Sequence, residues 1–139
     1  MRDKIFLDTN ILVYAHDDDA IEKKVKAQTL ILDGLRSGKT VISTQVLSEF
    51  YVTVTRKARI PMPIAQAKRE IDLLSNMETA DVDIATIRRA IDLQERWKIN
   101  YRDSLILAAA EQTDCEMVFS EDLSDGQSYG SVTVRNPLK

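Results

Sequence analysis

The sequence predicts an α/β fold in which a mainly parallel sheet is covered by helices on both faces. Short β-like runs alternate with segments of helical periodicity along the chain, as expected where helices connect parallel strands. The chain has 139 residues, of which 44% are hydrophobic and 29% charged. These values fit one globular domain with a substantial core, so we expect residues 1–139 to form a single domain.

Five short segments are predicted to be strands because they are apolar or β-branched and end in turns or helix starts. They are residues 5–7, 40–43, 78–80, 117–120 and 131–135. Residues 78–80 carry the weakest pattern, so we expect a sheet of four or five strands.

The segments between these strands are predicted to be helices. One covers residues 21–36 and ends at Gly38, and another covers residues 84–98 with isoleucines at near-helical spacing. Two prolines separate a helix at residues 64–74 from the preceding helix, which holds Glu49.

Composition excludes several classes of site. Cys115 is the only cysteine and His16 the only histidine, so the chain has neither an internal disulfide framework nor a Cys/His zinc site. The net charge is -3, which is unlike a nucleic-acid binder that acts through overall positive charge. A polyanionic substrate would therefore need a local basic patch or a metal ion.

The sequence gives no indication of a membrane partner. Its apolar runs are far shorter than the roughly 18 residues that a membrane span needs. Asp3 and Lys4 stand where a secretory leader would need a hydrophobic stretch. We therefore expect a cytoplasmic protein.

Four carboxylates stand where an apolar run meets a turn or a helix. Asp8 and Asp122 follow predicted strands, Glu49 lies in the helix after the second strand, and Asp103 begins the apolar helix at residues 103–110. Sites in parallel sheets lie beyond the carboxyl ends of the strands, near the point where strand order reverses. Asp8 and Asp122 would be neighbours if the first and fourth predicted strands are adjacent.

Clustered carboxylates predict a divalent cation, because like charges a few Å apart oppose one another's ionisation. Mg²⁺ and Mn²⁺ prefer oxygen ligands and are commonly held by carboxylates together with substrate phosphate oxygens. A bound ion can lower the pKa of a water molecule and stabilise charge on a phosphoryl oxygen. The hypothesis is a metal-dependent nuclease.

Each acid also has a simpler interpretation. Asp103 and Asp8 could be plain helix N-caps, Glu49 a solvated helix residue and Asp122 an ordinary loop acid. Only their joint occurrence at strand exits and helix entries favours a shared site. For the acidic run at residues 17–19, we favour capping of the helix that begins at residue 21 over a second metal site.

Together these motifs resemble those of PIN-domain ribonucleases over essentially the whole chain. They are Asp8-Thr9-Asn10-Ile11-Leu12, the helical Glu49, the apolar segment at residues 103–110 and Ser120-Glu121-Asp122. The tail at residues 120–137 is similar to that of VapC-type toxins of bacterial toxin-antitoxin pairs. The resemblance implies a Rossmann-like α/β/α sandwich, Mg²⁺- or Mn²⁺-dependent endonucleolytic cleavage of RNA, a small antitoxin partner and a homodimer.

By this resemblance Asp8, Glu49, Asp103 and Asp122 match the family's four acidic residues. We expect Asp8 and Asp103 to bind the metal directly or through water, and Asp122 to complete its ligands. Glu49 would orient or deprotonate the attacking water.

Two polar residues match the helpers beside the first and last acids. Asn10 and Ser120 would hold the carboxylates or waters in place by hydrogen bonds. Asp125 is a further acid near Asp122 and leaves the ligand from that loop less certain.

Basic residues are candidates for contacting RNA phosphates, although solvated helix faces explain most of them equally well. They are Arg56, Lys57, Arg59, Arg88, Arg89 and Arg102.

Three rival functions are less favoured. Haloacid-dehalogenase-like phosphatases need Asp-x-Asp, whereas the chain has Asp8-Thr9-Asn10. No Gly-x-Gly-x-x-Gly loop follows the first predicted strand, which argues against dinucleotide binding. The main alternative is a PIN-like module that binds RNA or a protein without cutting.

Overall fold

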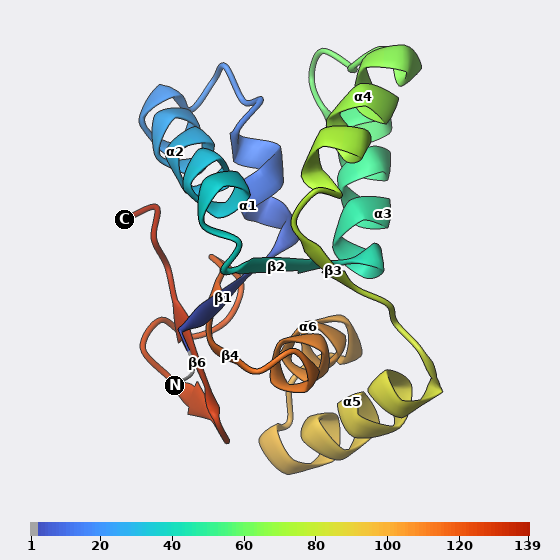
Figure 1. Cartoon of the computed structure of the whole chain (residues 1–139), viewed down its shortest axis with the longest axis vertical. Helices are drawn as coiled ribbons and strands as arrows, with labels where there is room; N and C mark the ends of the chain where they lie inside the picture. The colour runs from blue at the N-terminus through green and yellow to red at the C-terminus, as the bar shows by residue number, and fades with distance from the viewer. Residues whose placement is uncertain (1–2) are drawn as a thin grey trace.

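The computed structural model describes residues 3–139, and within them a mostly parallel sheet forms the centre of the fold (Figure 1). Its strand order is β3-β2-β1-β4-β6-β5. The strands are β1 (Lys4–Leu7), β2 (Thr40–Ser43), β3 (Glu78–Ala80), β4 (Cys115–Phe119), β5 (Ser128–Tyr129) and β6 (Val132–Arg135).

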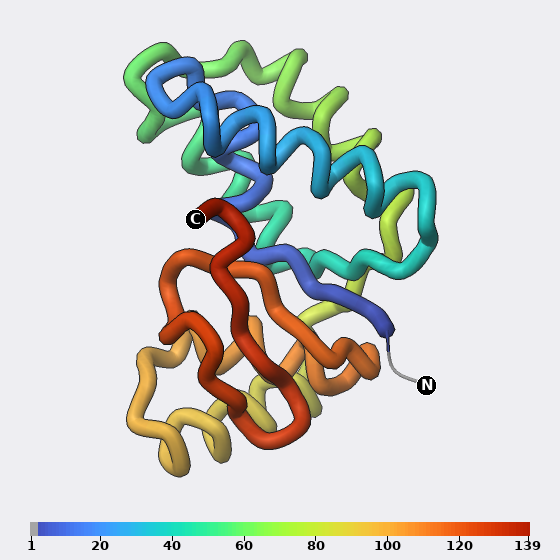
Figure 2. Tube along the Cα trace, turned by 90° about the vertical axis from the view of Figure 1, so that its left-hand side faces the viewer, coloured from blue at the N-terminus to red at the C-terminus, as the bar shows by residue number. Residues whose placement is uncertain are grey.

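Helices cover both faces of this sheet, as predicted. In Figure 1 the helices α1 to α4 lie above the sheet and α5 and α6 lie below it, and the turned view in Figure 2 shows the same two layers. The helices are α1 (Thr9–Tyr14), α2 (Ile21–Ser37), α3 (Thr44–Val52), the π-helical turn η1 (Thr53–Lys57), α4 (Ile64–Leu74), α5 (Ile84–Trp97) and α6 (Tyr101–Gln112).

Most predicted elements agree with these bounds, but the prediction of four or five strands is wrong. Six strands are present in residues 3–139 because Ser128–Tyr129 pairs antiparallel with β6 across a turn at Gly130. Gly130 has a φ of 66°, which favours glycine. A strand of two residues is too short to show an alternating pattern, so no periodicity along the chain could predict it.

The capping prediction for the acidic run at residues 17–19 is also wrong. The N-cap of α2 is Ala20, and no side chain caps this helix. Asp17 instead accepts a hydrogen bond from the backbone N–H of Asp19 at 3.0 Å. Asp and Asn often form such local bonds in turns, in competition with helix capping.

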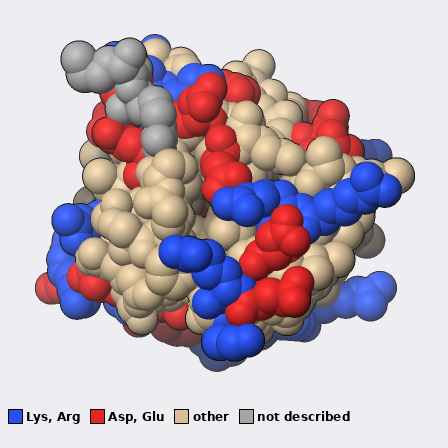
Figure 3. All heavy atoms as spheres, turned by 90° about the horizontal axis from the view of Figure 1, so that it is seen from below, with Lys and Arg blue, Asp and Glu red and all other residues tan. Residues whose placement is uncertain are grey.

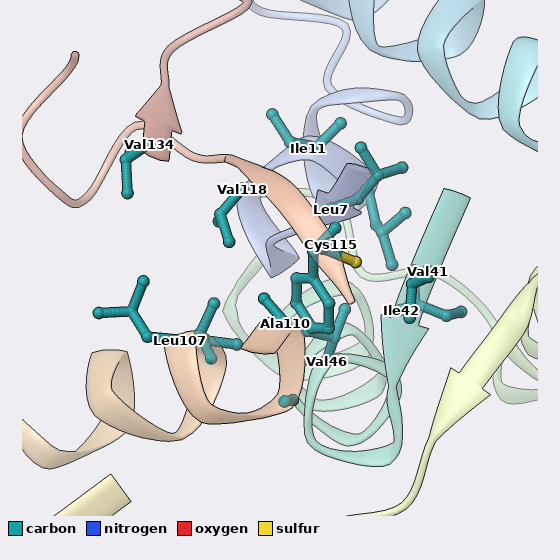
Figure 4. Close-up of a cluster of buried hydrophobic side chains, with 14 of the residues drawn as sticks. Leu7, Ile11, Val41, Ile42, Val46, Leu107, Ala110, Cys115, Val118 and Val134 are labelled. Atoms are coloured by element: carbon teal, nitrogen blue, oxygen red, sulfur yellow. The ribbon is translucent and has the colours of Figure 1, made fainter. Parts of the chain in front are cut away.

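The core lies between the central strands and the helices packed on them (Figure 4). Val41, Ile42 and Val118 have no exposed surface, and Leu107 of α6 is 1% exposed. Burial of one such side chain contributes about 1.5–3 kcal/mol. Cys115 is also fully buried in this core.

Parallel pairing of β1 with β4 brings the ends of both strands to one edge. Leu7 pairs with Phe119, and the backbone N–H of Asp8 donates to the carbonyl oxygen of Phe119 at 3.0 Å. The predicted adjacency of the first and fourth predicted strands is therefore confirmed. The chain leaves both strands at the same edge of the sheet. Asp8 is the first residue after β1, and Ser120 is the first residue after β4.

The described chain, residues 3–139, holds no helix that is both long and apolar enough to span a membrane.

Candidate active site

Asp8 stands at the carboxyl end of β1 and is completely buried. It is the N-cap of α1, because its Oδ1 accepts a hydrogen bond from the backbone N–H of Thr9 at 2.7 Å. The capping interpretation of this residue is thus correct as local structure. Capping occupies only part of the carboxylate, and its remaining contacts come from residues far away in the sequence.

Glu49 reaches the same edge from α3, which begins directly after β2. Ser43 caps this helix by accepting a hydrogen bond from Val46 N at 3.2 Å. Two turns later, Glu49 Oε1 accepts a hydrogen bond of 2.6 Å from Thr9 Oγ1. The first turn of α1 and the middle of α3 are therefore joined beside Asp8.

Asp103 arrives at the start of α6, but it is not the cap of that helix. Asn100 is the N-cap: its Oδ1 accepts from Asp103 N at 2.8 Å, and its Nδ2 donates to Asp103 Oδ2 at 2.8 Å. This reciprocal pair resembles a capping box. Asp103 is 6% exposed, and its Oδ1 faces the other carboxylates through Arg102.

Ser120 links the loop after β4 to Asp8. Its hydroxyl donates to Asp8 Oδ2 at 2.7 Å and accepts from Asp122 N at 3.0 Å, and the residue has no exposed surface. Asp122 lies at the rim, where its side chain is 51% exposed.

Arg102 lies among the four carboxylates and contacts every one. Its Nη2 is 2.6 Å from Asp8 Oδ1 and 2.7 Å from Glu49 Oε1. Its Nη1 is 3.0 Å from Asp103 Oδ1 and 3.4 Å from Asp122 Oδ2. We call Asp8, Glu49, Asp103, Asp122 and Arg102 the carboxylate cluster. The sequence placed Arg102 among possible RNA contacts, whereas here it contacts the protein's own acids.

Burial and neighbouring charges have opposing effects on the pKa values of the carboxylate cluster, and which effect prevails differs from residue to residue. Burial would lower the pKa of Arg102, but its hydrogen bonds to Asp8 and Glu49 outweigh this and raise the pKa. Burial would raise the pKa of Glu49, but hydrogen bonds from Arg102 and Thr9 lower it. The pKa of Asp122 is raised, mainly by burial and also by the charge of Asp8. Asp122 is therefore the acid of this set that a nearby cation would help to ionise.

The four acids of the carboxylate cluster offer only oxygen atoms as ligands, and hard divalent ions such as Mg²⁺ and Mn²⁺ prefer oxygen ligands. Within residues 3–139, however, no group of three or more Asp, Glu, His or Cys side chains is arranged to hold a metal as it stands. The guanidinium of Arg102 lies where the four carboxylates meet and contacts each of them. The residue types of the cluster suit such an ion, whereas the space between them is taken by Arg102.

Asn10 lies beside Asp122, and its predicted role as a helper of the carboxylates or waters stays a prediction. Its amide lies close enough to Asp122 to favour the ionised carboxylate. Neither its Oδ1 nor its Nδ2 has a hydrogen-bond partner in the described chain, although both atoms are buried. Asn10 therefore offers the cleft a donor and an acceptor that water or a substrate could satisfy.

Sequence reasoning missed the contacts of Thr9 and Asn100. A signal existed for both, since Thr9 lies between two predicted site residues and Asn100 stands three positions before Asp103, where an N-cap is expected. The pairing of Thr9 with Glu49, 40 positions away, depends on tertiary structure.

A cleft of about 620 Å³ opens on the carboxylate cluster and is lined by Glu49, Arg102 and Asp122. Tyr14 and Lys23 hold its wall by hydrogen bonds to Glu121, each 2.8 Å long. A second cavity of about 640 Å³ is lined by residues 17–19 and 57–63 among others, and none of the four cluster acids lines it. The cleft and the second cavity have similar volumes. The carboxylates at the cleft, and not its size, indicate that it is the candidate active site.

The predicted basic contacts separate by position. Lys57, at the end of η1, lines the cleft. Arg59 forms a bidentate ion pair with Asp19, in which both hydrogen bonds are 3.0 Å long. Arg89 forms an ion pair with Glu111 at 2.7 Å. The face seen from below in Figure 3 mixes both charge signs and has no broad basic patch. Lys57 lines both the cleft and the second cavity, and it is the one of these candidates that lines the cleft without an acidic partner in the described chain.

Asp125 turns away from the cluster. Its Oδ1 accepts a hydrogen bond from Asn136 N at 2.9 Å, and its Oδ2 is 2.9 Å from Lys139 Nζ. These contacts fix the C-terminal segment, and they favour Asp122 as the acid that this loop contributes to the cluster.

The PIN domain family model matches residues 5–124, which span every residue of the cluster. The chain belongs to the PIN domain family. PIN domains of this kind include nucleases, and their fold agrees with the helix-covered sheet described above. Among curated protein sequences, none matches this chain significantly.

Solved structures with the same fold include several toxins of toxin-antitoxin pairs. A toxin-antitoxin complex from Klebsiella pneumoniae has 20% identity and a TM-score of 0.69, covering 96% of this PIN domain chain and 98% of its own. Mycobacterium tuberculosis VapC20, a toxin that cleaves the sarcin-ricin loop, has 18% identity and a TM-score of 0.68, covering 86% and 92%. VapBC2 from Rickettsia felis, bound to a promoter DNA fragment, has 20% identity and a TM-score of 0.65, covering 94% and 96%.

Proposed function

We propose that this PIN domain is a Mg²⁺- or Mn²⁺-dependent endoribonuclease that hydrolyses RNA phosphodiester bonds. The observation that carries this proposal is the convergence of four carboxylates from separate parts of the chain at one cleft. Such a concentration of negative charge is unfavourable for folding alone, which favours a function that needs it.

Asp8, Asp103 and Asp122 are the residues that would hold the ion. When bound, the ion would supply a water molecule of lowered pKa and stabilise negative charge on the phosphoryl group. Asp8 and Asp103 are buried and fixed by hydrogen bonds, whereas Asp122 lies at the rim. The ligand set would therefore have two rigid members and one adjustable member.

Glu49 would orient the attacking water. Its lowered pKa keeps it ionised, which suits a hydrogen-bond acceptor better than a strong base. Thr9 fixes one carboxylate oxygen of Glu49, and Ser120 fixes one of Asp8. These hydroxyls would keep both acids in place during catalysis.

The RNA backbone would lie along the cleft, with Lys57 close to a phosphate. Contacts of this kind supply affinity without sequence specificity. The free amide of Asn10 would be available to a water molecule or to the RNA at the same rim.

We further propose that the protein is the toxin of a type II toxin-antitoxin pair, acting in the cytoplasm with a cognate antitoxin and as a homodimer. The solved toxin-antitoxin complexes of the same fold support a protein partner. Three isoleucines on α5 are exposed and form an apolar surface that a second copy of the chain could bury in a dimer. They are Ile84, Ile87 and Ile91. Light scattering of the purified chain would test the dimer.

One observation favours a second function, that of a PIN-like module that binds RNA or a protein without cutting. Arg102 already contacts all four acids, and a permanent occupant would keep a metal out. The two functions differ in whether RNA is cleaved when Mn²⁺ or Mg²⁺ is supplied.

The deciding experiment measures cleavage of total cellular RNA by the purified chain with Mn²⁺ or Mg²⁺ and with EDTA. We expect cleavage only with the metal, and its loss in Asp122→Asn. This substitution alters a half-exposed side chain, so the variant should fold.

Asp125→Asn is the matched control, because it makes the same chemical change in the same loop but away from the cluster. It should cleave like the wild type. Equal cleavage by wild type and Asp122→Asn would contradict the assigned ligand. No cleavage with either metal would favour the binding module.

A further inference from the structure

Arg102 is the counter-ion of the carboxylate cluster within the described chain. Every ion pair that Asp8, Glu49, Asp103 and Asp122 form there involves its guanidinium. Asp8 and Asp103 have side chains only 0% and 8% exposed, so water screens them poorly. Without a positive charge among them, these acids would oppose the fold.

The guanidinium of Arg102 occupies the space between the carboxylate oxygens that are the proposed metal ligands. A magnesium ion lies about 2.0–2.1 Å from its ligand oxygens. The guanidinium nitrogens of Arg102 are 2.6 Å from an oxygen of Asp8 and 3.0 Å from one of Asp103. Both cations cannot approach these oxygens together, because they would overlap in space and repel each other.

Arg102 can leave without disturbing its helix. The backbone is fixed, since its carbonyl oxygen accepts from Gln45 Nε2 at 3.3 Å and it lies in the first turn of α6. The side chain is 32% exposed and lines the cleft. Rotation about the long arginine side chain would carry the guanidinium toward solvent while the backbone stays in place.

We propose that Arg102 is an internal counter-ion that a divalent metal ion displaces from the carboxylate cluster. This inference rests on the proposed metal-dependent function. Arg102 keeps the acids together when no metal is bound, and metal binding is an exchange of one cation for another. The two occupants exclude each other, so weakening the hold of Arg102 strengthens the hold on the metal.

The test is the affinity for Mn²⁺ alone, measured by isothermal titration calorimetry at neutral pH without RNA. Arg102→Gln removes the competing charge and should bind Mn²⁺ about tenfold or more tightly than the wild type, within the usual range of coupling between two sites. Arg102→Lys keeps the charge but loses the planar fork, and its affinity should lie nearer to that of the wild type.

Arg89→Gln is the matched control. Arg89 also forms a bidentate ion pair with a glutamate, Glu111, through hydrogen bonds of 2.7 and 3.1 Å. This pair is separate from the carboxylate cluster. Its loss should leave Mn²⁺ affinity unchanged.

The outcomes separate the exchange from the metal site itself. If the wild type and Arg102→Gln bind Mn²⁺ equally well, the exchange is wrong and the metal site stands. If neither binds Mn²⁺ more tightly than Asp122→Asn, the proposed metal site fails as well.

A measurement on the wild type covers the case in which Arg102→Gln does not fold. In a ¹H–¹⁵N spectrum, the Arg102 Nε–H should be shielded from exchange by its bonds to Glu49, both 3.2 Å long. Mg²⁺ titration should shift this signal and speed its exchange with water. A signal that stays unchanged while backbone amides near Asp8 report Mg²⁺ binding would overturn the proposal. The Arg102→Lys spectrum assigns the signal.

Discussion

Two acidic regions of this protein share their residue type and differ in almost everything else. The acidic loop at residues 17–19 has three consecutive aspartates, each with its own separate contact. Asp17 bonds a backbone N–H, Asp18 pairs with Lys24, and Asp19 pairs with Arg59. The carboxylate cluster instead takes single acids from four distant segments and gives them one shared arginine.

The difference lies in solvent access. Asp18 is 76% exposed and Asp19 63% exposed, so water screens each charge and the pairs contribute little. Asp8 is fully buried, and its charge depends on the hydrogen bonds and the cation that the fold supplies. A dense acidic sequence thus indicates less about function than sparse acids that the fold brings together.

Asp8→Asn gives the largest expected contrast. It weakens charge-assisted bonds to Ser120 and Arg102 in a buried place, so the free energy of unfolding should fall by about 2–4 kcal/mol. Asp18→Asn in the acidic loop should leave stability close to the wild type. Urea denaturation with EDTA present measures both, and equal losses would show that burial does not distinguish the two regions.

Ser120→Ala tests how the cluster is held. The substitution removes a donor to Asp8 and an acceptor for Asp122 N, so stability should fall by about 1–3 kcal/mol. Mn²⁺ affinity should fall by about 10–100-fold, as is typical when a residue supporting a metal ligand is lost. Calorimetry measures the affinity. Ser128→Ala, which alters an exposed hydroxyl paired with Thr133, is the control and should change neither quantity.

Asp122→Asn should change how the stability of the fold depends on pH. The folded pKa of Asp122 is raised above its ordinary value of 3.8, so the ionised carboxylate destabilises the metal-free fold at neutral pH. The variant should therefore be more stable than the wild type at pH 7. As the pH falls through the folded pKa toward 3.8, the wild-type acid becomes protonated and this advantage should disappear. Denaturation curves at several pH values check this, and an advantage that is constant with pH would contradict it.

Lys57→Ala has the smallest expected effect. If Lys57 contacts one phosphate, RNA binding should weaken similarly for all sequences, and the slope of log affinity against log salt should decrease by about 1. Fluorescence anisotropy with Asp122→Asn as background would prevent cleavage during the titration. Lys68→Ala, an exposed lysine on α4 outside the cleft, should keep the full slope.

Much of the fold was predictable because local patterns agree with it. Residues 40–43, 78–80 and 64–74 were predicted with the bounds that the structure has. α6 begins at Tyr101, two residues before the predicted start, because Asn100 and not Asp103 caps it. β5 was missed because its pairing with β6 depends on a turn and on contacts beyond two residues.

The four acids of the candidate site were also predictable, since Asp8, Asp103 and Asp122 mark strand exits or helix entries and Glu49 lies in the helix after the second strand. Their roles as catalytic and metal-binding residues stay predictions. The contacts of Arg102 were not predictable, because an arginine before Asp103 looks the same in sequence whether it faces solvent or its own acids.

The sequence by itself determined the order of strands and helices, the buried stripes and the positions of the acids along the chain, because these follow from local periodicity and residue type. Tertiary structure alone decided that β1 lies beside β4, that Thr9 meets Glu49 and that Arg102 stands among four carboxylates. Electrostatic energy depends on distance in space and on exposure to water, and separation along the chain specifies neither.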